Sequence, residues 1–280
     1  MFKTRLLSGI VVAAVMLLFT WLGGPYLGAF LMCVSIAGLH EFYRATGVIA
    51  PQKHLNALSA VGYAGTVLCY ILLMLPGKEL FSVLFVLVLA LVVLMAVYVF
   101  GFPGYKAGEV AFTYFGFFYV SVMLSFIYLT RSLEMGIYIV WLIFFSSWFC
   151  DVFAYFTGML IGKHKLAPVL SPKKSIEGAV GGVVFPAIFG AIYGYCINRY
   201  AASGFPVAAF TALTAIGAVV SQIGDLSASA IKRNYEIKDY GNLIPGHGGI
   251  LDRFDSVIFT APMIYFTAGC FLEYFWVNLK

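Results

Sequence analysis

The chain has 280 residues, of which 62% are hydrophobic and only 10% are charged, with a formal net charge of +5 and a mean hydropathy of +0.97. A soluble globular protein carries about 25% charged residues to cover its surface, so this composition excludes water as the only solvent. Several apolar stretches reach the roughly 18 residues that a helix needs to cross a bilayer. Because they are continuous rather than alternating, we predict an all-α integral membrane protein.

In chain order, we expect about nine transmembrane helices, at residues 6–22, 25–43, 55–75, 80–100, 108–129, 134–161, 176–198, 205–231 and 256–278. No A-x-A cleavage motif follows the first stretch, so we interpret it as a retained helix rather than a signal peptide. About five spans form an N-terminal transmembrane region, 1–130. About four form a C-terminal catalytic region, 131–280, with two long polar segments at 162–175 and 232–255.

The basic residues predict the orientation, because cytoplasmic loops are enriched in Lys and Arg. With the N-terminus inside, thirteen basic residues lie on the inner side, and only Lys78, Arg131, Arg199 and Lys280 lie outside. Both polar segments therefore face the cytoplasm, and we expect a multi-pass protein of the inner cell membrane with a cytoplasm-facing polar site.

Two carboxylates lie toward the inner ends of apolar spans. An ionisable side chain is costly there, so its presence indicates a structural or functional role. Asp151 has Ser147 and Tyr155 at i−4 and i+4, which predicts one polar stripe on the sixth span. On the eighth span, a polar row shares one face and leads from the membrane into the basic segment. Its members are Gln222, Asp225, Ser229 and Lys232. At the inner end of the second span, His40, Glu41 and Arg44 are interpreted as a structural charge cluster.

The stretch IPGHGGILDRFD, residues 244–255, combines glycines with charged side chains. Gly248 and Gly249 allow backbone N–H groups to approach a ligand, as in phosphate-binding loops. Asp252 and Asp255 follow at i, i+3, and such carboxylates suit Mg²⁺ together with substrate phosphates. His247 and Arg253 add donors for phosphate oxygens.

The stretch SPKKSIEG, residues 171–178, opens the seventh span. We predict a helix start with Ser171 as N-cap and Pro172 at N1. Lys173 and Lys174 would then oppose the helix dipole unless an anion binds there, and a topological role for these lysines is the alternative. We expect Gly178, with Gly182, to allow close helix packing.

These motifs together resemble the CDP-diacylglycerol synthases, also called phosphatidate cytidylyltransferases. The resemblance rests on Ser229, the Lys232-Arg233 pair, Lys238-Asp239, Gly241, Pro245, His247-Gly248-Gly249, Asp252-Arg253 and Asp255. The stretch 162–182 is similar to a second family block, and Asp151 with Ala154-Tyr155 to a third. The resemblance covers motifs over roughly 145–260 and is compositional before that.

The resemblance implies transfer of the cytidylyl group of CTP to phosphatidate, giving CDP-diacylglycerol and pyrophosphate. It implies Mg²⁺ at Asp225 and Asp252, with a second cation also compatible. Catalytic roles would fall to Lys232, Arg233, Asp255, His247 and Asp151. Substrate binding would fall to Ser171, Lys173, Lys174, Ser229, Lys238, Asp239, Gly248, Gly249 and Arg253. The expected partners are CTP, phosphatidate and the lipid bilayer; no nucleic acid is expected, and a homodimer is compatible with the sequence.

Two alternatives remain open at this point. The first is a secondary transporter that uses membrane carboxylates to couple an ion, although the carboxylates here lie near helix ends rather than at mid-membrane. The second is a neighbouring enzyme, such as a lipid or polyprenol kinase or a cytidylyltransferase for an ether-linked lipid.

Overall fold

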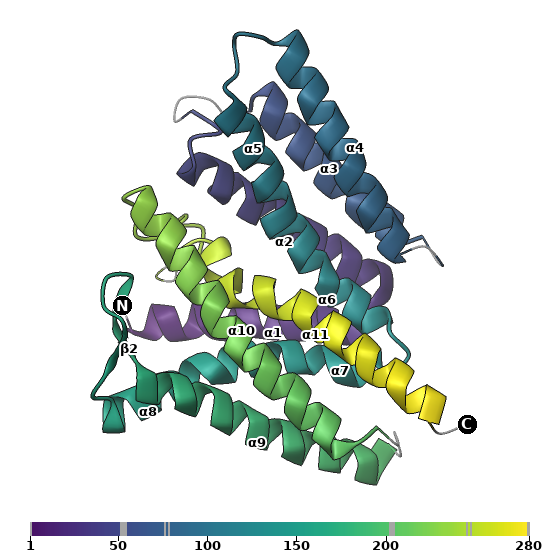
Figure 1. Ribbon diagram of the computed structural model, residues 1–280, viewed down its shortest axis with the longest axis vertical. Coiled ribbons are helices and arrows are strands. Elements are labelled where there is room, and N and C mark those ends of the chain that lie inside the picture. Colours follow the sequence, from purple (N-terminus) through teal and green to yellow (C-terminus); the bar gives the residue numbers. More distant parts are fainter. Residues whose placement is uncertain are drawn as a thin grey trace. The chain divides into compact units, whose positions relative to one another are not determined.

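The computed structural model describes residues 2–50, 55–75, 77, 79–201, 205–244, 246 and 248–278. Helices dominate this part of the chain (Figure 1). They are α1 (Phe2–Leu22), α2 (Gly24–Ala45), α3 (Ala57–Leu73), α4 (Glu79–Phe100), α5 (Ala107–Gly116), α6 (Met123–Ser132), α7 (Gly136–Phe144), α8 (Cys150–Ile161), α9 (Ile176–Ala201), α10 (Val207–Asn234) and α11 (Leu251–Asn278). Two π-helical segments, Phe117–Val122 and Phe145–Phe149, join α5 to α6 and α7 to α8.

A helical segment lies at each predicted span. Seven of the described helical segments are long and apolar enough to cross a membrane; α3 and the part of α1 with described side chains, Ser8–Leu22, are apolar and shorter. The prediction of a helical multi-pass membrane protein is therefore confirmed. The number of crossings, nine, stays a prediction.

The chain forms two compact units, each built from two separate stretches. Unit 1 comprises Met1–Leu129 and Asn234–Phe254, and unit 2 comprises Thr130–Arg233 and Asp255–Lys280. The predicted division into transmembrane and catalytic regions, 1–130 and 131–280, concerns function as well as packing and stays a prediction.

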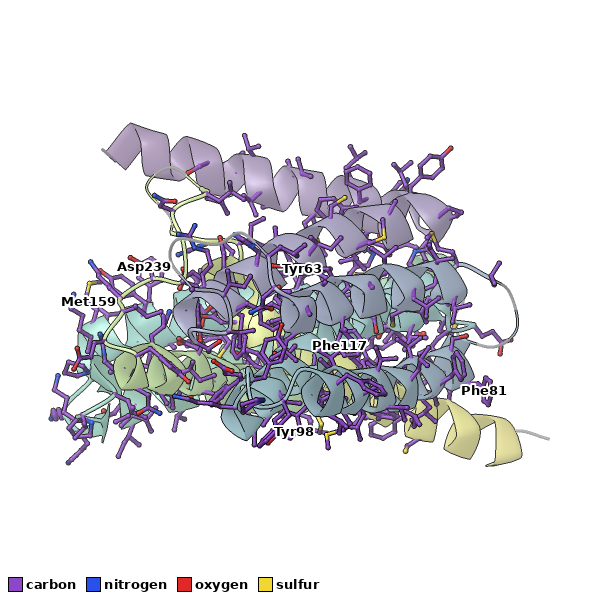
Figure 2. All side chains as sticks on the ribbon, turned by 90° about the horizontal axis from the view of Figure 1, so that it is seen from above. Tyr63, Phe81, Tyr98, Phe117, Met159 and Asp239 are labelled. Carbon is purple, nitrogen blue, oxygen red and sulfur yellow. The ribbon has the colours of Figure 1, made fainter. Side chains whose placement is uncertain are left out.

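Unit 1 is a helical bundle in which α3 packs against α2 and α4, and α5 with its π-helical extension packs against α2 and α3. Asn56 caps α3, since its side chain accepts the Ser59 N–H (2.7 Å) while Ser59 Oγ accepts the Asn56 N–H (3.0 Å). Phe117 is buried within this unit, whereas Phe81 is mostly exposed at its periphery, the exposure expected of a lipid-facing side chain (Figure 2).

Unit 2 depends on close packing through glycine. The α8–α9 pair meets where Gly178 and Gly182 lie against α8. A methyl group at Gly182 would come within 3.0 Å of Cys150 O, and one at Gly178 within 2.7 Å of Ala154 O. The prediction that these two glycines allow close helix packing is confirmed.

The segment 162–175 is not a plain loop, because it contains a short antiparallel hairpin. Strand β1 (Lys165–Ala167) pairs with strand β2 (Ser171–Ser175). Helix α9 begins only at Ile176, where Ser175 Oγ accepts the Gly178 N–H at 3.1 Å and so caps the helix. The predicted helix start at Ser171 and Pro172 is therefore wrong, and Lys173 and Lys174 lie on strand β2 rather than in a first helical turn.

The second polar segment is also shorter than predicted, because both flanking helices extend into it. Helix α10 runs to Asn234, so Lys232 and Arg233 occupy its last turn, where cations complement the helix dipole. Helix α11 begins at Leu251, which places Asp252 in its first turn rather than in a loop before it.

The prediction that Ser147, Asp151 and Tyr155 form one polar stripe is wrong. Ser147 belongs to the π-helical segment and is fully buried, and it donates to Ile143 O at 2.9 Å. Asp151 and Tyr155, on α8, are exposed. A π-helical turn contains more residues than an α-helical turn. It therefore shifts Ser147 away from the helix face that Asp151 and Tyr155 share.

Candidate functional site

The hairpin of unit 2 forms one wall of a cavity of about 430 Å³, which we call the hairpin cavity. Predicted site residues from three elements line it: Asp151 on α8, Ser171, Lys173 and Lys174 on β2, and Asp225 on α10. The ammonium of Lys174 forms an ion pair with Asp225 Oδ2. Both side chains are less than a third exposed, so water screens this pair less than a surface pair.

A third carboxylate joins this group. Asp255, half-buried on α11, interacts electrostatically with Asp225 and Asp151 and with the ammonium of Lys232. Three like charges in one region repel one another unless cations compensate them. The lysines of β2 and α10 provide part of that compensation, and the arrangement suits ligands that bring both phosphate and metal charge.

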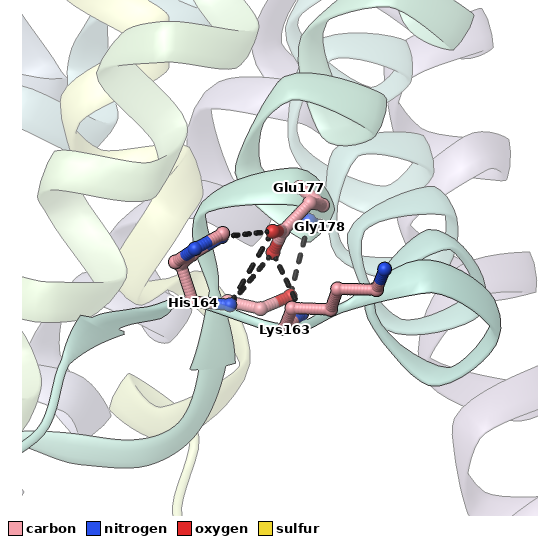
Figure 3. Close-up of polar contacts among 5 residues, drawn as sticks. Lys163, His164, Glu177 and Gly178 are labelled. Carbon is pink, nitrogen blue, oxygen red and sulfur yellow. Dashed lines mark hydrogen bonds and ion pairs between the residues drawn. The ribbon is translucent and has the colours of Figure 1, made fainter.

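The hairpin is anchored to the start of α9 by Glu177 (Figure 3). Its Oε2 accepts the backbone N–H groups of Lys163 (3.0 Å) and His164 (3.2 Å), and its Oε1 lies 2.6 Å from His164 Nδ1. A carboxylate in the first turn of a helix also favours the helix dipole. The hairpin that carries Lys174 is thus closed at its base. Sequence reasoning missed this residue, because backbone N–H partners leave no pattern in the sequence.

In unit 1, residues 235–250 connect α10 to α11, and we call this segment the signature loop. It lines most of a second cavity of about 540 Å³, the signature-loop cavity. The predicted substrate-binding residues Lys238, Asp239, Gly248 and Arg253 line it. Gly248 has a φ of +81°, a left-handed conformation that favours glycine. Two cations beside a glycine turn are a chemical match for phosphate oxygens.

Asp252 is buried at the base of this loop. Its Oδ2 accepts the Tyr240 N–H at 2.8 Å and the Gly249 N–H at 3.0 Å, so Asp252 organises the loop whatever else it binds. The N–H of Gly249, predicted to face a phosphate, is used in this contact. Predicted residue His247 lies outside the described residues.

Glu41 on α2 is a second buried carboxylate at the same loop. It accepts the N–H groups of Ile250 (3.0 Å) and Leu251 (2.8 Å), where α11 begins. Sequence reasoning assigned it to a local cluster with His40 and Arg44. Its partners lie about two hundred residues away in the chain, and no spacing rule reaches that far.

The predicted metal ligands Asp225 and Asp252 belong to different units. Within the ranges that the structure describes, no three His, Cys, Asp or Glu side chains are grouped closely enough to hold a metal by themselves. Mg²⁺ typically takes only one or two carboxylates and completes its shell with substrate phosphates and water, so the donor chemistry fits. Joint binding by these two carboxylates stays a prediction, as do the roles of Ser229 on α10 and Arg233 at its end.

The fold and these two cavities define a class: a helical multi-pass membrane protein whose polar segments bring lysine, arginine, aspartate and glycine residues to two cavities. The chain matches the cytidylyltransferase family over residues 3–271 and belongs to that family.

Similar proteins share nearly the whole chain. The phosphatidate cytidylyltransferase of Brucella abortus is 33% identical over 273 residues, covering 97% of this chain and 94% of that protein. The phosphatidate cytidylyltransferase of Bacillus subtilis is 31% identical over 276 residues, covering 96% and 98%. That of Staphylococcus haemolyticus is 30% identical over 268 residues, covering 94% and 97%. Family membership favours cytidylyl transfer over ion-coupled transport or lipid phosphorylation.

Proposed function

We propose that this protein transfers the cytidylyl group of CTP to phosphatidate, giving CDP-diacylglycerol and pyrophosphate in phospholipid biosynthesis. The observation that carries the proposal is the match to phosphatidate cytidylyltransferases along almost the entire chain, signature loop included. The two cavities also support the proposal, because each is lined by cationic side chains that can bind the phosphates of the substrates.

The reaction needs a phosphatidate oxygen to attack the α-phosphorus of CTP in line, while the bond to pyrophosphate breaks. The attacking phosphate is already ionised, so no strong general base is required. The main task of the protein is to orient the two phosphates and to stabilise the negative charge of the transition state. Lys174 and Lys232 in unit 2, and Lys238 and Arg253 in unit 1, are the cations that we assign to this task.

We assign a divalent metal, Mg²⁺ by preference, to Asp225 and Asp252, with Asp255 and Asp151 in supporting roles. These are hard oxygen donors of the kind that Mg²⁺ prefers; Asp252 is buried, Asp225 and Asp255 are partly buried, and Asp151 is exposed at the hairpin cavity. When bound, such an ion neutralises phosphate charge and polarises the phosphorus.

For topology, we propose that both polar segments face the cytoplasm, in the inner cell membrane, where CTP is available. The distribution of basic residues supports this orientation, thirteen against four. An amphiphilic substrate would then enter from the leaflet and a soluble nucleotide from the aqueous side.

The direct test is an assay on purified protein in detergent, with phosphatidate, CTP and Mg²⁺. We expect pyrophosphate and CDP-diacylglycerol to appear in equal amounts, the lipid product being identified by mass. Parallel reactions should replace phosphatidate by an ether-linked phospholipid acid or by a polyprenol. Preference for either substitute, or release of pyrophosphate without a cytidylylated lipid, would contradict the proposal.

A further inference from the structure

Glu41 is an acidic side chain with a position that the reaction alone does not explain. It lies on α2, near the other end of the chain from the signature loop, and its side chain is buried. One carboxylate oxygen accepts the Ile250 N–H and the other accepts the Leu251 N–H. Ile250 is the residue before α11 and Leu251 is its first residue, and the N–H groups at the start of a helix have no internal partners. A carboxylate also suits the positive end of the helix dipole.

Two glycines of the signature loop make room for this carboxylate. The three heavy atoms nearest to a methyl group at Gly241 all belong to the Glu41 side chain, and Cδ would lie 2.7 Å away. The same holds at Gly249, where Glu41 Cδ would lie 2.5 Å away. Real Cβ atoms do not approach that closely, so neither position accepts a side chain while Glu41 stays in place. Neither glycine has a left-handed φ, so close approach is the reason for glycine at both positions.

The carboxylate therefore lies against the loop at both ends of its glycine turn, which contains Gly246 and Gly248. Between Gly241 and Gly249 lies the glycine turn, and Asp239 and Arg253 flank it. Asp252, which follows the two capped amides, binds Tyr240 and Gly249 through their backbone N–H groups. Two carboxylates, one from α2 and one from α11, thus fix the loop at neighbouring points.

We propose that Glu41 is a positioning residue: it clamps the signature loop and the start of α11, so that Asp252 and Arg253 are held in a productive geometry. The inference rests on the proposed function, since it assigns to Glu41 the orientation of that same site. Glu41 touches no substrate in this scheme and acts only through the loop.

The test compares Glu41→Gln, Glu41→Ala and Gly249→Ala with the wild type. Glu41→Ala should lower kcat about 100-fold, the size of effect that small misplacement of reacting groups produces. Glu41→Gln keeps one acceptor oxygen and should lose only about tenfold, the equivalent of one charge-assisted hydrogen bond. Hydrogen exchange at the Ile250 and Leu251 amides should accelerate in the same order.

Combining Gly249→Ala with Glu41→Ala gives a more specific test, because the effects of the two substitutions on turnover should not be independent. Gly249→Ala should be costly in the wild type, because its methyl group collides with the Glu41 carboxylate. In the Glu41→Ala background the collision is absent, so the double variant should be no slower than the Glu41→Ala variant. Losses that multiply instead would contradict the clamp.

A matched control lies on the same helix. Ser35 is fully buried on α2 and hydrogen-bonds to Tyr70 at 2.8 Å, away from the loop. Ser35→Ala should lower the melting temperature without changing kcat or amide exchange at 250–251, measured below the transition. If Glu41→Ala cannot be purified folded, Glu41→Gln and Gly249→Ala carry the test.

Wild-type turnover in the Glu41 variants, with or without faster exchange, would overturn the positioning role. Absence of CDP-diacylglycerol in the wild type would instead contradict the proposed function. In that case two measurements would still test the clamp. They are hydrogen exchange at the Ile250 and Leu251 amides, and the non-additivity of Glu41→Ala and Gly249→Ala in melting temperature.

Discussion

Replacing Lys174 by alanine tests whether the hairpin takes part in the reaction. Its ammonium pairs with Asp225 at the hairpin cavity, and the lysine is less than a third exposed. If this lysine only sets membrane orientation, its removal should leave turnover near normal, because Lys173 and the other lysines predicted to face the cytoplasm remain. If it binds phosphate and compensates Asp225, activity should fall while insertion persists.

The size of the loss follows from the contacts. A hydrogen bond to a charged group contributes about 1.5–3 kcal/mol, and each 1.4 kcal/mol is a tenfold change, so kcat/KM should fall about 10- to 100-fold. Loss of the cation also leaves the Asp225 charge near Asp255 and Asp151 less compensated, which adds to the cost. Lys174→Ala and Asp225→Asn should therefore be strongly non-additive in a double-mutant cycle.

The assay is cytidylyl transfer to phosphatidate by purified variants, with expression and membrane insertion checked on the same preparations. Lys165→Ala is the matched control, since Lys165 is exposed on the partner strand β1 and carries the same charge on the same hairpin. Such a surface change should alter kcat/KM by no more than about twofold. Equal losses in the two variants, or near-wild-type turnover in Lys174→Ala, would refute the assigned role.

Three further predictions concern the metal and the orientation. Excess EDTA should abolish turnover and Mg²⁺ or Mn²⁺ should restore it; full activity in EDTA would contradict metal dependence. Asp225→Asn and Asp252→Asn should cost activity to a similar extent, and the double variant should be little worse; losses that multiply, with unchanged Mg²⁺ dependence, would exclude a shared ion. In a cysteine-free background, an impermeant thiol reagent applied outside should label Lys78→Cys and not Lys173→Cys; the opposite pattern would reverse the orientation.

Much of the fold could be predicted because a membrane helix must be long, apolar and continuous to satisfy its backbone in lipid. The predictions of local structure that were wrong concern segments whose conformation depends on contacts with residues elsewhere in the chain. Ser171 and Pro172 have the local preferences of a helix start, yet pairing with Lys165–Ala167 draws this stretch into a strand. Ser175 then caps α9 in their place. The π-helical segment ahead of Asp151 was not predicted either, and it altered which residues share a face.

The site divides in the same way. Some site residues could be predicted because they would act through charged side chains, which the sequence shows directly. The structure places four of them at the two cavities: Lys174, Asp225, Lys238 and Arg253. Glu41 is different: its partners are backbone N–H groups, which every residue except proline possesses. Nothing in residue identity marks such a partner, so only coordinates reveal it.

Glu41 and Glu177 answer the same physical problem in separate parts of the chain. Each lies on an apolar helix, and each carboxylate accepts two consecutive backbone N–H groups. Glu177 accepts those of Lys163 and His164 between α8 and β1, and Glu41 accepts those of Ile250 and Leu251 at the start of α11. Near a membrane, an N–H group that finds neither protein nor water is costly, and irregular backbone is tolerated only where partners are supplied. A chain with 10% charged residues has little capacity for a separate soluble domain that could order its active-site loops. In each case a carboxylate on an apolar helix supplies those partners, and at the start of α11 that carboxylate, Glu41, lies about two hundred residues away in the sequence.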